Sequence, residues 1–447
     1  MVKASDKIGV IIPVVALLTL FLLAACSSGE DERSFSLAES TVTPSAAQTP
    51  AVLSPSISPG NPVLPEFTAS SGTIVITIGN LTDLTGPGAH AMSYATMALE
   101  DMVRYYNDEH LIPGVELKTA TYDGQLDPSR DIPGYEWLKR EGANLIFSPV
   151  PSAAVILKPR LEEDGIVMFA LAPTEQSLAP PGYVFSPSNI LCKPQSYTLL
   201  KWIAENDPDF PQDRPAKIGG AFWAESYGAS ILAGAKEYAR DYPDQYDWEG
   251  SHLTDFITFN WQAEVEKLRD CDYVIPPAPM TQFVKQYRDA GYTAKFIGYD
   301  AHLGFLGMVD AAGIWDEVDG MLFIKPGLWW NEEGEMINLC EELIHRYHSD
   351  KAEEIMGAGV GYQAAHGVYL MLELIADAVK AVGSEGFNSQ AVYDAVQEFS
   401  IEVDGCEYNF SETKRVATNC LAVYELQAAE KDVFKVDTEW IPAVASP

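Results

Sequence analysis

Three polar residues follow predicted strands and could together hold a small charged molecule. Ser152, Thr174 and Asp300 each come just after a short apolar stretch typical of a buried strand. The carboxyl ends of parallel strands meet at one edge of a sheet, and ligands bind there. A helix N-terminus at Ser152 would offer a hydroxyl and free amides to a carboxylate. The anion Asp300 would suit an ammonium group, so this spacing predicts a site for a zwitterion.

Each of these residues also has a purely structural interpretation. Ser152 could cap its own helix, Thr174 could close a local turn, and Asp300 could cap a helix from His302. The sequence leaves these alternatives open.

Strand and helix patterns alternate in the first part of the chain after residue 72. The predicted strands are residues 73–78, 117–122, 145–147, 166–170 and 183–185. Apolar residues recur at helical spacing over residues 92–106, and a second helix is predicted at 130–142. Alternating strands and helices with short turns predict a doubly wound parallel sheet.

The same alternation begins again at residue 216. The predicted strands are residues 216–222, 253–259, 273–275, 295–299 and 321–324, and the predicted helices between them are 226–240, 261–269 and 281–290. Helices predicted at 332–348, 361–381 and 389–399 need a sheet to cover, so the chain is expected to return to the first sheet. The expected fold class is α/β, with two doubly wound parallel-sheet lobes.

The N-terminus has the pattern of an export signal. Lys3 and Lys7 precede an apolar run over residues 8–25, and Ala24-Ala25 precedes Cys26. This ending resembles the bacterial lipobox, in which the cysteine receives lipid and becomes the mature N-terminus. The alternative is an uncleaved membrane anchor, although the run is near the lower limit for spanning a bilayer. We expect a lipoprotein signal peptide and lipidation at Cys26.

A segment poor in apolar residues follows Cys26. Ser, Thr and Pro make up nearly half of residues 27–72, a composition that cannot bury enough apolar surface to fold. A flexible chain of about 45 residues spans roughly 35–40 Å. The segment is therefore expected to be a disordered tether, and a mucin-like stalk would behave in the same way.

The overall charge excludes some classes of partner. A net charge of −35 argues against a nucleic-acid binder, because few cations are present to neutralise phosphates. It also argues against adhesion to anionic lipid headgroups.

The cysteines suggest one disulfide and no metal site. No Cys-x-x-Cys pair occurs among the six cysteines, which excludes a zinc knuckle or a thioredoxin-like motif. Cys406 and Cys420 flank a segment that resembles a hairpin with residues 411–413 at its turn, and they are the disulfide candidate. Setting Cys26 aside leaves five cysteines, so an odd thiol must be left over.

Catalysis finds little support in the sequence. None of the motifs GxSxG, HExxH, GxGxxG or a Walker loop occurs. His345 and His348 share a helix face, but no nearby set of ligands completes a metal site. The chain is predicted not to be an enzyme, and no metal or other cofactor is expected.

Four short motifs in order resemble one family. They are Gly-Asn-Leu-Thr-Asp-Leu-Thr-Gly-Pro-Gly at 79–88, Tyr-Asp-Gly at 122–124 with Asp-Pro at 127–128, Trp-Ala-Glu-Ser-Tyr-Gly at 223–228, and Lys-Pro at 325–326. Over residues 73–430 the chain is similar to the Leu/Ile/Val-binding proteins of ABC importers, which have the type I periplasmic-binding fold. The resemblance implies two lobes joined by three crossovers, with ligand in the cleft between them. The implied domains are a signal peptide at 1–25, a tether at 26–72, lobe 1 at 73–190 and 326–402, and lobe 2 at 191–325 and 403–447.

The resemblance also implies roles for particular residues. The loop with Ala172 and Thr174 matches the one that binds the ligand carboxylate, and Asp300 matches the acid that binds the α-amino group. Tyr227 matches a tyrosine that packs over the ligand, although it could equally be a core aromatic residue. The loop at residues 276–279 departs from the family pattern because its three prolines offer few amide donors.

The side-chain pocket is expected to differ from that of the family. His90 lies in the glycine-rich loop, and Trp223 and Trp329 are candidates for a larger apolar wall, with Trp330 beside them. Tryptophan in a fold of this size also packs in the core or at the hinge.

The predicted function is capture of a small amino-acid-like solute for an ABC importer. The implied partners are the solute, the permease subunits and the membrane through the lipid anchor, at an extracytoplasmic location on a bacterial cell. Two alternatives stay open: an extracellular ligand sensor of the same fold, and a binding protein for an aromatic acid or amide.

Overall fold

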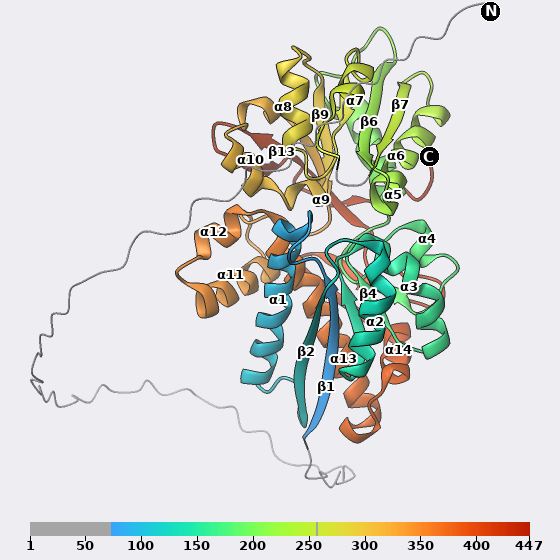
Figure 1. The fold of residues 1–447 in the computed structure, drawn as a ribbon, viewed down its shortest axis with the longest axis vertical. Coiled ribbons are helices and arrows are strands. Elements are labelled where there is room, and N and C mark those ends of the chain that lie inside the picture. Colours follow the sequence, from blue (N-terminus) through green and yellow to red (C-terminus); the bar gives the residue numbers. More distant parts are fainter. Residues whose placement is uncertain (1–72, 256–257) are drawn as a thin grey trace, which may run out of the picture. The chain divides into compact units, whose positions relative to one another are not determined.

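The computed structural model describes residues 73–255 and 258–447. The predicted leader, Cys26 and the tether lie outside the described residues. Figure 1 shows the described chain as helices arranged around two main sheets.

The first sheet is built from five parallel strands. They are β1 (Ile74–Thr82), β2 (Val115–Asp123), β3 (Ala143–Ser148), β4 (Met168–Ala170) and β5 (Val184–Phe185). The helices between them are α1 (Ala89–Asp108), α2 (Asp131–Arg140), α3 (Pro151–Asp164) and α4 (Glu175–Leu178). The strand order is β2-β1-β3-β4-β5, so the predicted doubly wound parallel sheet is confirmed.

The second sheet repeats this order. Its parallel part is β7-β6-β8-β9-β10, formed by β6 (Ala216–Trp223), β7 (Tyr246–Thr254), β8 (Tyr273–Ile275), β9 (Lys295–Tyr299) and β10 (Leu322–Lys325). Its helices are α5 (Cys192–Asn206), α6 (Ser226–Asp241), α7 (Gln262–Lys267), α8 (Thr281–Asp289), α9 (Asp300–Leu303) and α10 (Leu306–Ala312). Antiparallel strands extend it beyond β10, namely β13 (Cys420–Gln427), β14 (Asp432–Lys435) and β15 (Ile441–Pro442).

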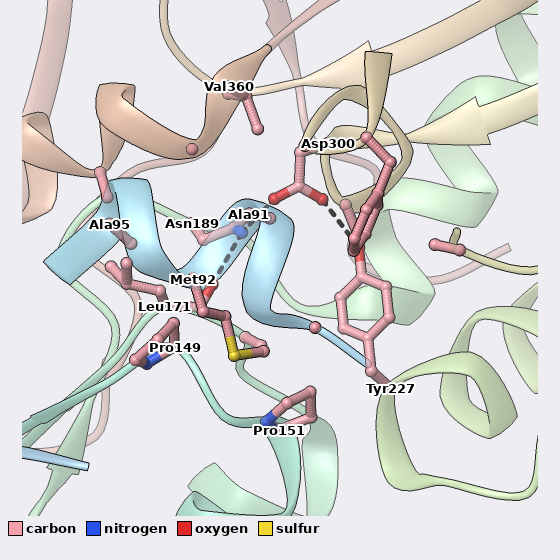
Figure 2. Close-up of a pocket in the computed structure, with 18 of the residues that line it drawn as sticks. Ala91, Met92, Ala95, Pro149, Pro151, Leu171, Asn189, Tyr227, Asp300 and Val360 are labelled. Carbon is pink, nitrogen blue, oxygen red and sulfur yellow. Dashed lines mark hydrogen bonds between the residues drawn. The ribbon is translucent and has the colours of Figure 1, made fainter. Parts of the chain in front are cut away.

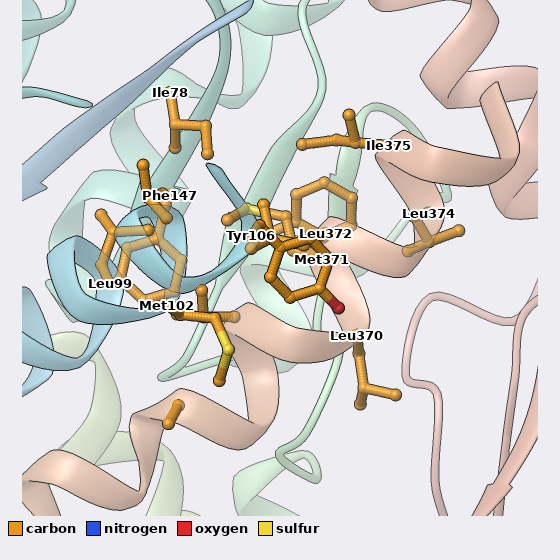
Figure 3. Close-up of a cluster of buried hydrophobic side chains, with 14 of the residues drawn as sticks. Ile78, Leu99, Met102, Tyr106, Phe147, Leu370, Met371, Leu372, Leu374 and Ile375 are labelled. Atoms are coloured by element: carbon orange, nitrogen blue, oxygen red, sulfur yellow. The ribbon is translucent and has the colours of Figure 1, made fainter. Parts of the chain in front are cut away.

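The last third of the chain returns to the first sheet, as predicted. It contains α11 (Glu335–His348), α12 (Ala352–Gly357), the 3-10 helix η3 (Val360–Ala364), α13 (Ala365–Val382) and α14 (Ser389–Glu398). The helix α13 is buried on most sides, which explains its nearly continuous apolar sequence. Leu372 and Ile375 of this helix belong to one core with Ile78, Leu99 and Phe147 (Figure 3).

The chain passes between the two sheets three times. It leaves the first sheet after β5, returns after β10, and leaves again after the short hairpin of β11 (Ser400–Val403) and β12 (Cys406–Asn409). These passages are the three crossovers that the resemblance implies. Their position matters because the loops at the strand ends of both sheets meet near them.

One strand lies earlier than predicted. The sequence suggests a strand at residues 253–259, but β7 occupies Tyr246–Thr254. This strand lies at the edge of the sheet and, within the described residues, pairs with β6 alone. Only its first residue, Tyr246, is buried, and the others alternate between exposed and half-buried. Because many of its residues are polar, β7 does not form the apolar run that predicts a buried parallel strand.

The predicted hairpin between Cys406 and Cys420 is also placed differently. β12 pairs with β11 through a turn at Asp404-Gly405, where both residues have positive φ. The Asp-Gly pair is a strong turn signal, so the hairpin forms around residues 404–405 rather than after Cys406. Residues 411–414 do form a local turn, and a disulfide joins Cys406 to Cys420 with a Cα–Cα distance of 6.2 Å.

Candidate functional site

A cavity of about 540 Å³ lies where the loops of the two sheets meet. Its lining includes residues that follow β1, β3 and β4 of the first sheet and β6 and β9 of the second. Most of the lining is apolar, and Figure 2 shows Ala91, Met92 and Ala95 of α1 facing the same space as Leu171 and Val360. This is the position expected for a ligand in open parallel sheets.

Asp300 lies in the cavity wall at the end of β9. The hydroxyl of Tyr227 donates to Asp300 Oδ1 at 2.7 Å, and the side-chain amide of Asn189 donates to Oδ2 (Figure 2). Burial raises the pKa of the Asp300 carboxyl, whereas these two donated bonds lower it. Two donors hold both carboxylate oxygens in place while the group still lines the cavity.

The carboxylate of Asp300 makes no ion pair within the described part of the chain. The nearby cation is Lys325, which helps to lower the pKa of Asp300. The Lys325 ammonium instead donates to the carbonyl oxygens of Gly327 at 2.8 Å and Leu328 at 2.7 Å.

Ser152 lines the cavity, but it does not cap its helix. The helix α3 begins at Pro151, its N-cap is Val150, and no side chain caps it. The Ser152 hydroxyl donates to Asp131 Oδ2 at 2.7 Å, and burial raises the pKa of Asp131 to about 6. The amides of the first turn remain unused by the helix, as at any helix N-terminus.

Ala172 also lines the cavity, whereas Thr174 does not. Among the described residues, the backbone N–H of Ala172 has no hydrogen-bond partner. Thr174 is buried and caps α4: its hydroxyl accepts a hydrogen bond from the backbone N–H of Ser177. The structural interpretation of Thr174 is therefore the one that the structure supports.

Only one of the three candidates for the pocket wall lies there. Trp223 lines the cavity, and its indole N–H donates to the carbonyl of Thr258 at 2.9 Å. Trp329 is buried in the core of the second sheet and donates to Asp432, because its polar edge needs a buried partner. His90 is not part of the cavity lining. Its ring stacks on that of Phe305, which does line the cavity.

Several lining residues escaped the sequence analysis. Asn189 follows the short strand β5, and its amide also donates to the carbonyl of Leu171 at 2.9 Å. The rule that found Ser152 and Asp300 would have found Asn189 if applied to every strand end. Phe305 lies between α9 and α10, and Val360 begins the 3-10 helix η3, so neither follows a strand.

Residues 75–431 match the family model described as periplasmic binding protein. The chain belongs to the periplasmic binding protein family. Its predicted family and fold are confirmed, and it captures a small solute outside the cytoplasm. A search of curated proteins found no match for this periplasmic binding protein.

Solved structures share the fold of this periplasmic binding protein. A branched-chain amino acid ABC transporter protein from Thermus thermophilus with bound valine has a TM-score of 0.72 and 20% identity, covering 83% of this chain and 97% of that one. A fatty acid ABC transporter substrate-binding protein from Thermomonospora curvata has a TM-score of 0.70 and 16% identity. The match covers 83% of this chain and 94% of that one. A solute-binding protein of an ABC transporter from Rhodopseudomonas palustris HaA2 in complex with p-hydroxybenzoic acid has a TM-score of 0.67 and 14% identity. The match covers 83% of this chain and 98% of that one.

The described residues contain neither a membrane-spanning helix nor a cluster of metal-ligating side chains. No helix in residues 73–255 and 258–447 is long and apolar enough to cross a membrane. The same residues contain no group of three or more His, Cys, Asp and Glu side chains placed to hold a metal ion. His348, the second histidine of the predicted helix-face pair, instead contacts Asp101 at 2.8 Å.

Proposed function

We propose that this protein captures an amino-acid-like solute and delivers it to an ABC importer. The observation on which this rests is Asp300, a carboxylate that faces an apolar cavity and has hydrogen-bond donors but no ion pair in the described chain. A solute ammonium group would supply the missing cation, and charge-assisted hydrogen bonds of this kind are among the strongest.

The opposite end of the solute would be a carboxylate. Ser152 at the start of α3 and Ala172 line the cavity, and their backbone N–H groups would donate to this carboxylate. Free amides and the positive end of a helix dipole favour an anion at this position. Ser152 would contribute its backbone rather than its hydroxyl, which is already bound to Asp131.

The remainder of the solute would lie against apolar side chains. Met92, Leu171, Phe305 and Val360 line the cavity, and Tyr227, whose hydroxyl donates to Asp300, would cover the ammonium end. A cavity of about 540 Å³ is within the range found for small organic ligands. Its size leaves room for a solute larger than the smallest amino acids.

We further propose how the molecule is placed and how it works. Cys26 would be lipidated, and residues 26–72 would tether the binding domain to the bacterial membrane. The two sheets with their helices would form lobes that close on the solute, and the permease would recognise the closed form. Residues 403–417 would join the first lobe, because Cys406, Tyr408 and Ala417 pack in its core.

The decisive experiment compares matched ligands by calorimetric titration of the purified full chain. L-leucine carries the ammonium group, and 4-methylpentanoate is the same molecule without it. Asp300→Asn should weaken L-leucine by roughly 10- to 100-fold, since a buried bond to a charged group is worth about 1.5–3 kcal/mol. Asp289→Asn, the same change at an exposed site on α8, is the control.

The affinity for 4-methylpentanoate distinguishes an amino-acid site from a site for a simple or aromatic acid. Asp300→Asn should leave 4-methylpentanoate binding unchanged or improve it, because an unpaired carboxylate repels an anion. If the wild-type protein instead prefers the simple acid, or if Asp300→Asn leaves L-leucine affinity unchanged, the amino-acid proposal is wrong and the aromatic-acid alternative gains support.

A further inference from the structure

Two backbone segments that belong to different sheets touch each other beside the cavity. Residues 303–307 lead from α9 into α10, and Leu303 packs in the core of the second sheet. Residues 358–361 lead into η3, which continues to Tyr362 in the core of the first sheet. The backbone N–H of Gly307 donates to the carbonyl of Ala358 at 3.3 Å. This contact between residues 303–307 and 358–361 is termed the seam.

Glycine residues allow the two backbones of the seam to approach closely. Gly359 has φ of +117° and ψ of −145°, and a Cβ atom there would overlap the carbonyl oxygen of Leu303 in the opposite segment. A Cβ atom at Gly307 would lie 2.9 Å from His90 Nε2 and 3.2 Å from Ala358 Cα. The lack of a side chain at both positions is therefore what permits this contact.

Two aromatic contacts reinforce the seam. The indole N–H of Trp330 donates to the carbonyl of Gly359 at 3.0 Å, and Trp330 packs against the cores of both sheets. The ring of His90, at the start of α1, stacks on that of Phe305 with 6.2 Å between the ring centroids. Side chains from both sheets therefore hold the seam together in addition to its backbone hydrogen bond.

The seam lies directly behind the cavity wall. Phe305 and Val360 line the cavity, and Figure 2 shows the Val360 side chain on the cavity side of its segment. The residues that make the close backbone contact are not part of the lining, namely Leu303, Gly307, Ala358 and Gly359. A substitution at one of these four positions can therefore change how the two sheets meet without touching the solute.

We propose that the seam is the contact that holds the two lobes closed over the solute, with Gly359 as a positioning residue. This inference rests on the proposed function, because a solute bound between Asp300 and Ser152 draws the lobes together and the seam then forms behind it. In the open form the two segments separate, and a side chain at residue 359 meets no backbone from the opposite lobe.

Gly359→Ala is the variant that tests the seam. The overlap of its Cβ atom with a backbone oxygen cannot be relieved by rotating a side chain, so the closed form becomes less populated. The apparent affinity falls in proportion to the population that can bind, and L-leucine should bind at least about tenfold more weakly. Calorimetric titration of the purified full chain measures this loss.

Gly383→Ala is the matched control. Gly383 also has a conformation that mainly glycine adopts, with φ of +76° and ψ of 158°, but a Cβ atom there would meet nothing within 4 Å. Both alanine variants strain the backbone, so both should lower the melting temperature of the ligand-free protein. Only Gly359→Ala should lose affinity for L-leucine.

Hydrogen exchange at Gly307 reports on the seam itself. Gly307 lies in the first turn of α10, where an N–H has no partner within the helix, and its N–H bonds to Ala358 across the seam. Saturating L-leucine should therefore slow exchange of this amide in the wild type and in Gly383→Ala. In Gly359→Ala the same amide should exchange quickly with or without L-leucine.

Gly307→Leu provides a second test if Gly359→Ala fails to fold. Leucine is a good helix former, so the change suits α10 taken alone, but its side chain would press on His90 and Ala358 across the seam. It should also weaken L-leucine binding at least about tenfold. Ala311→Leu, at an exposed position of the same helix, is the control and should bind as the wild type does.

The outcomes separate this inference from the proposed function. If L-leucine binds the wild type but leaves exchange at Gly307 unchanged, the seam does not form on closure and the inference is wrong, while the proposed function stands. Wild-type affinity in Gly359→Ala or in a folded Gly307→Leu also refutes the seam alone. If the wild type binds no L-leucine, both proposals fail.

Discussion

The side-chain amide of Asn189 joins the loops of the two sheets at the cavity. It donates to the carbonyl of Leu171, which follows β4, and to the carboxylate of Asp300, which follows β9 (Figure 2). One buried amide therefore fixes the orientation of the acid relative to the first-sheet loop.

Asn189→Ala should weaken solute binding more than it weakens folding. The change removes one of the two donors that orient Asp300, so we expect roughly a tenfold loss of affinity for an amine-bearing solute, the effect of about one hydrogen bond to a charged group. Calorimetric titration measures the loss. Asn338→Ala, at an exposed position of α11, is the control. Equal affinities for the wild type and Asn189→Ala would show that Tyr227 alone orients the carboxylate.

The disulfide should stabilise the fold. Cys406 and Cys420 are 14 residues apart, and closing a loop of about 15 residues is worth roughly 3 kcal/mol in the chain-entropy model. The double variant Cys406→Ser with Cys420→Ser should lower the free energy of unfolding by about this amount in urea titrations. A reducing agent should destabilise the wild type by a similar amount and leave the variant unaffected. A wild type that is insensitive to reductant would contradict the prediction.

His302 should make stability depend on pH. The backbone N–H of Tyr299 donates to Nδ1 at 3.0 Å, so Nε2 carries the proton and donates to the carbonyl of Pro276 at 2.9 Å. Burial lowers the pKa of His302 from 6.5 to about 4. A pKa lowered in the folded state gives stability that is fully present above pH 6.5 and is lost as the pH falls through about 4.

The difference between wild type and His302→Gln isolates this effect. The wild type should lose about 3 kcal/mol more than the variant between pH 6.5 and 4, at about 1.4 kcal/mol per pKa unit. Urea unfolding at several pH values measures how the free energy of unfolding changes with pH for each protein. His345→Gln removes an exposed imidazole and is the control. If the free energy of unfolding falls equally with pH in the wild type and in His302→Gln, the pKa of this ring is the same in the folded and unfolded states.

Cys26 should decide whether the protein stays on the membrane. Cys26→Ala removes the thiol that would accept lipid, so the variant should appear in the soluble fraction or accumulate as unprocessed precursor. Fractionation and gel mobility in a bacterial host measure both outcomes. Ser27→Ala, which keeps the cysteine, is the control. Identical behaviour of Cys26→Ala and the wild type would exclude lipid anchoring at this residue.

The sequence by itself determined the class of fold and part of the site. Buried parallel strands such as β1 and β9 are short apolar runs, and their order sets where their ends meet. That rule pointed to Ser152 and Asp300, and the family resemblance pointed to Ala172 and Tyr227; all four residues line one cavity. The position of each strand end could be predicted because the order of strands and helices follows from apolar patterns that are local in the sequence.

Only the tertiary structure decided which atoms remain available to a solute. Thr174 and Trp329 have suitable side chains, but partners at Ser177 and Asp432 already satisfy them. Gln363 follows no strand, yet the returning helices bring this residue into the cavity lining. Hydrogen-bond satisfaction depends on neighbours distant in the chain, and local spacing does not encode those neighbours.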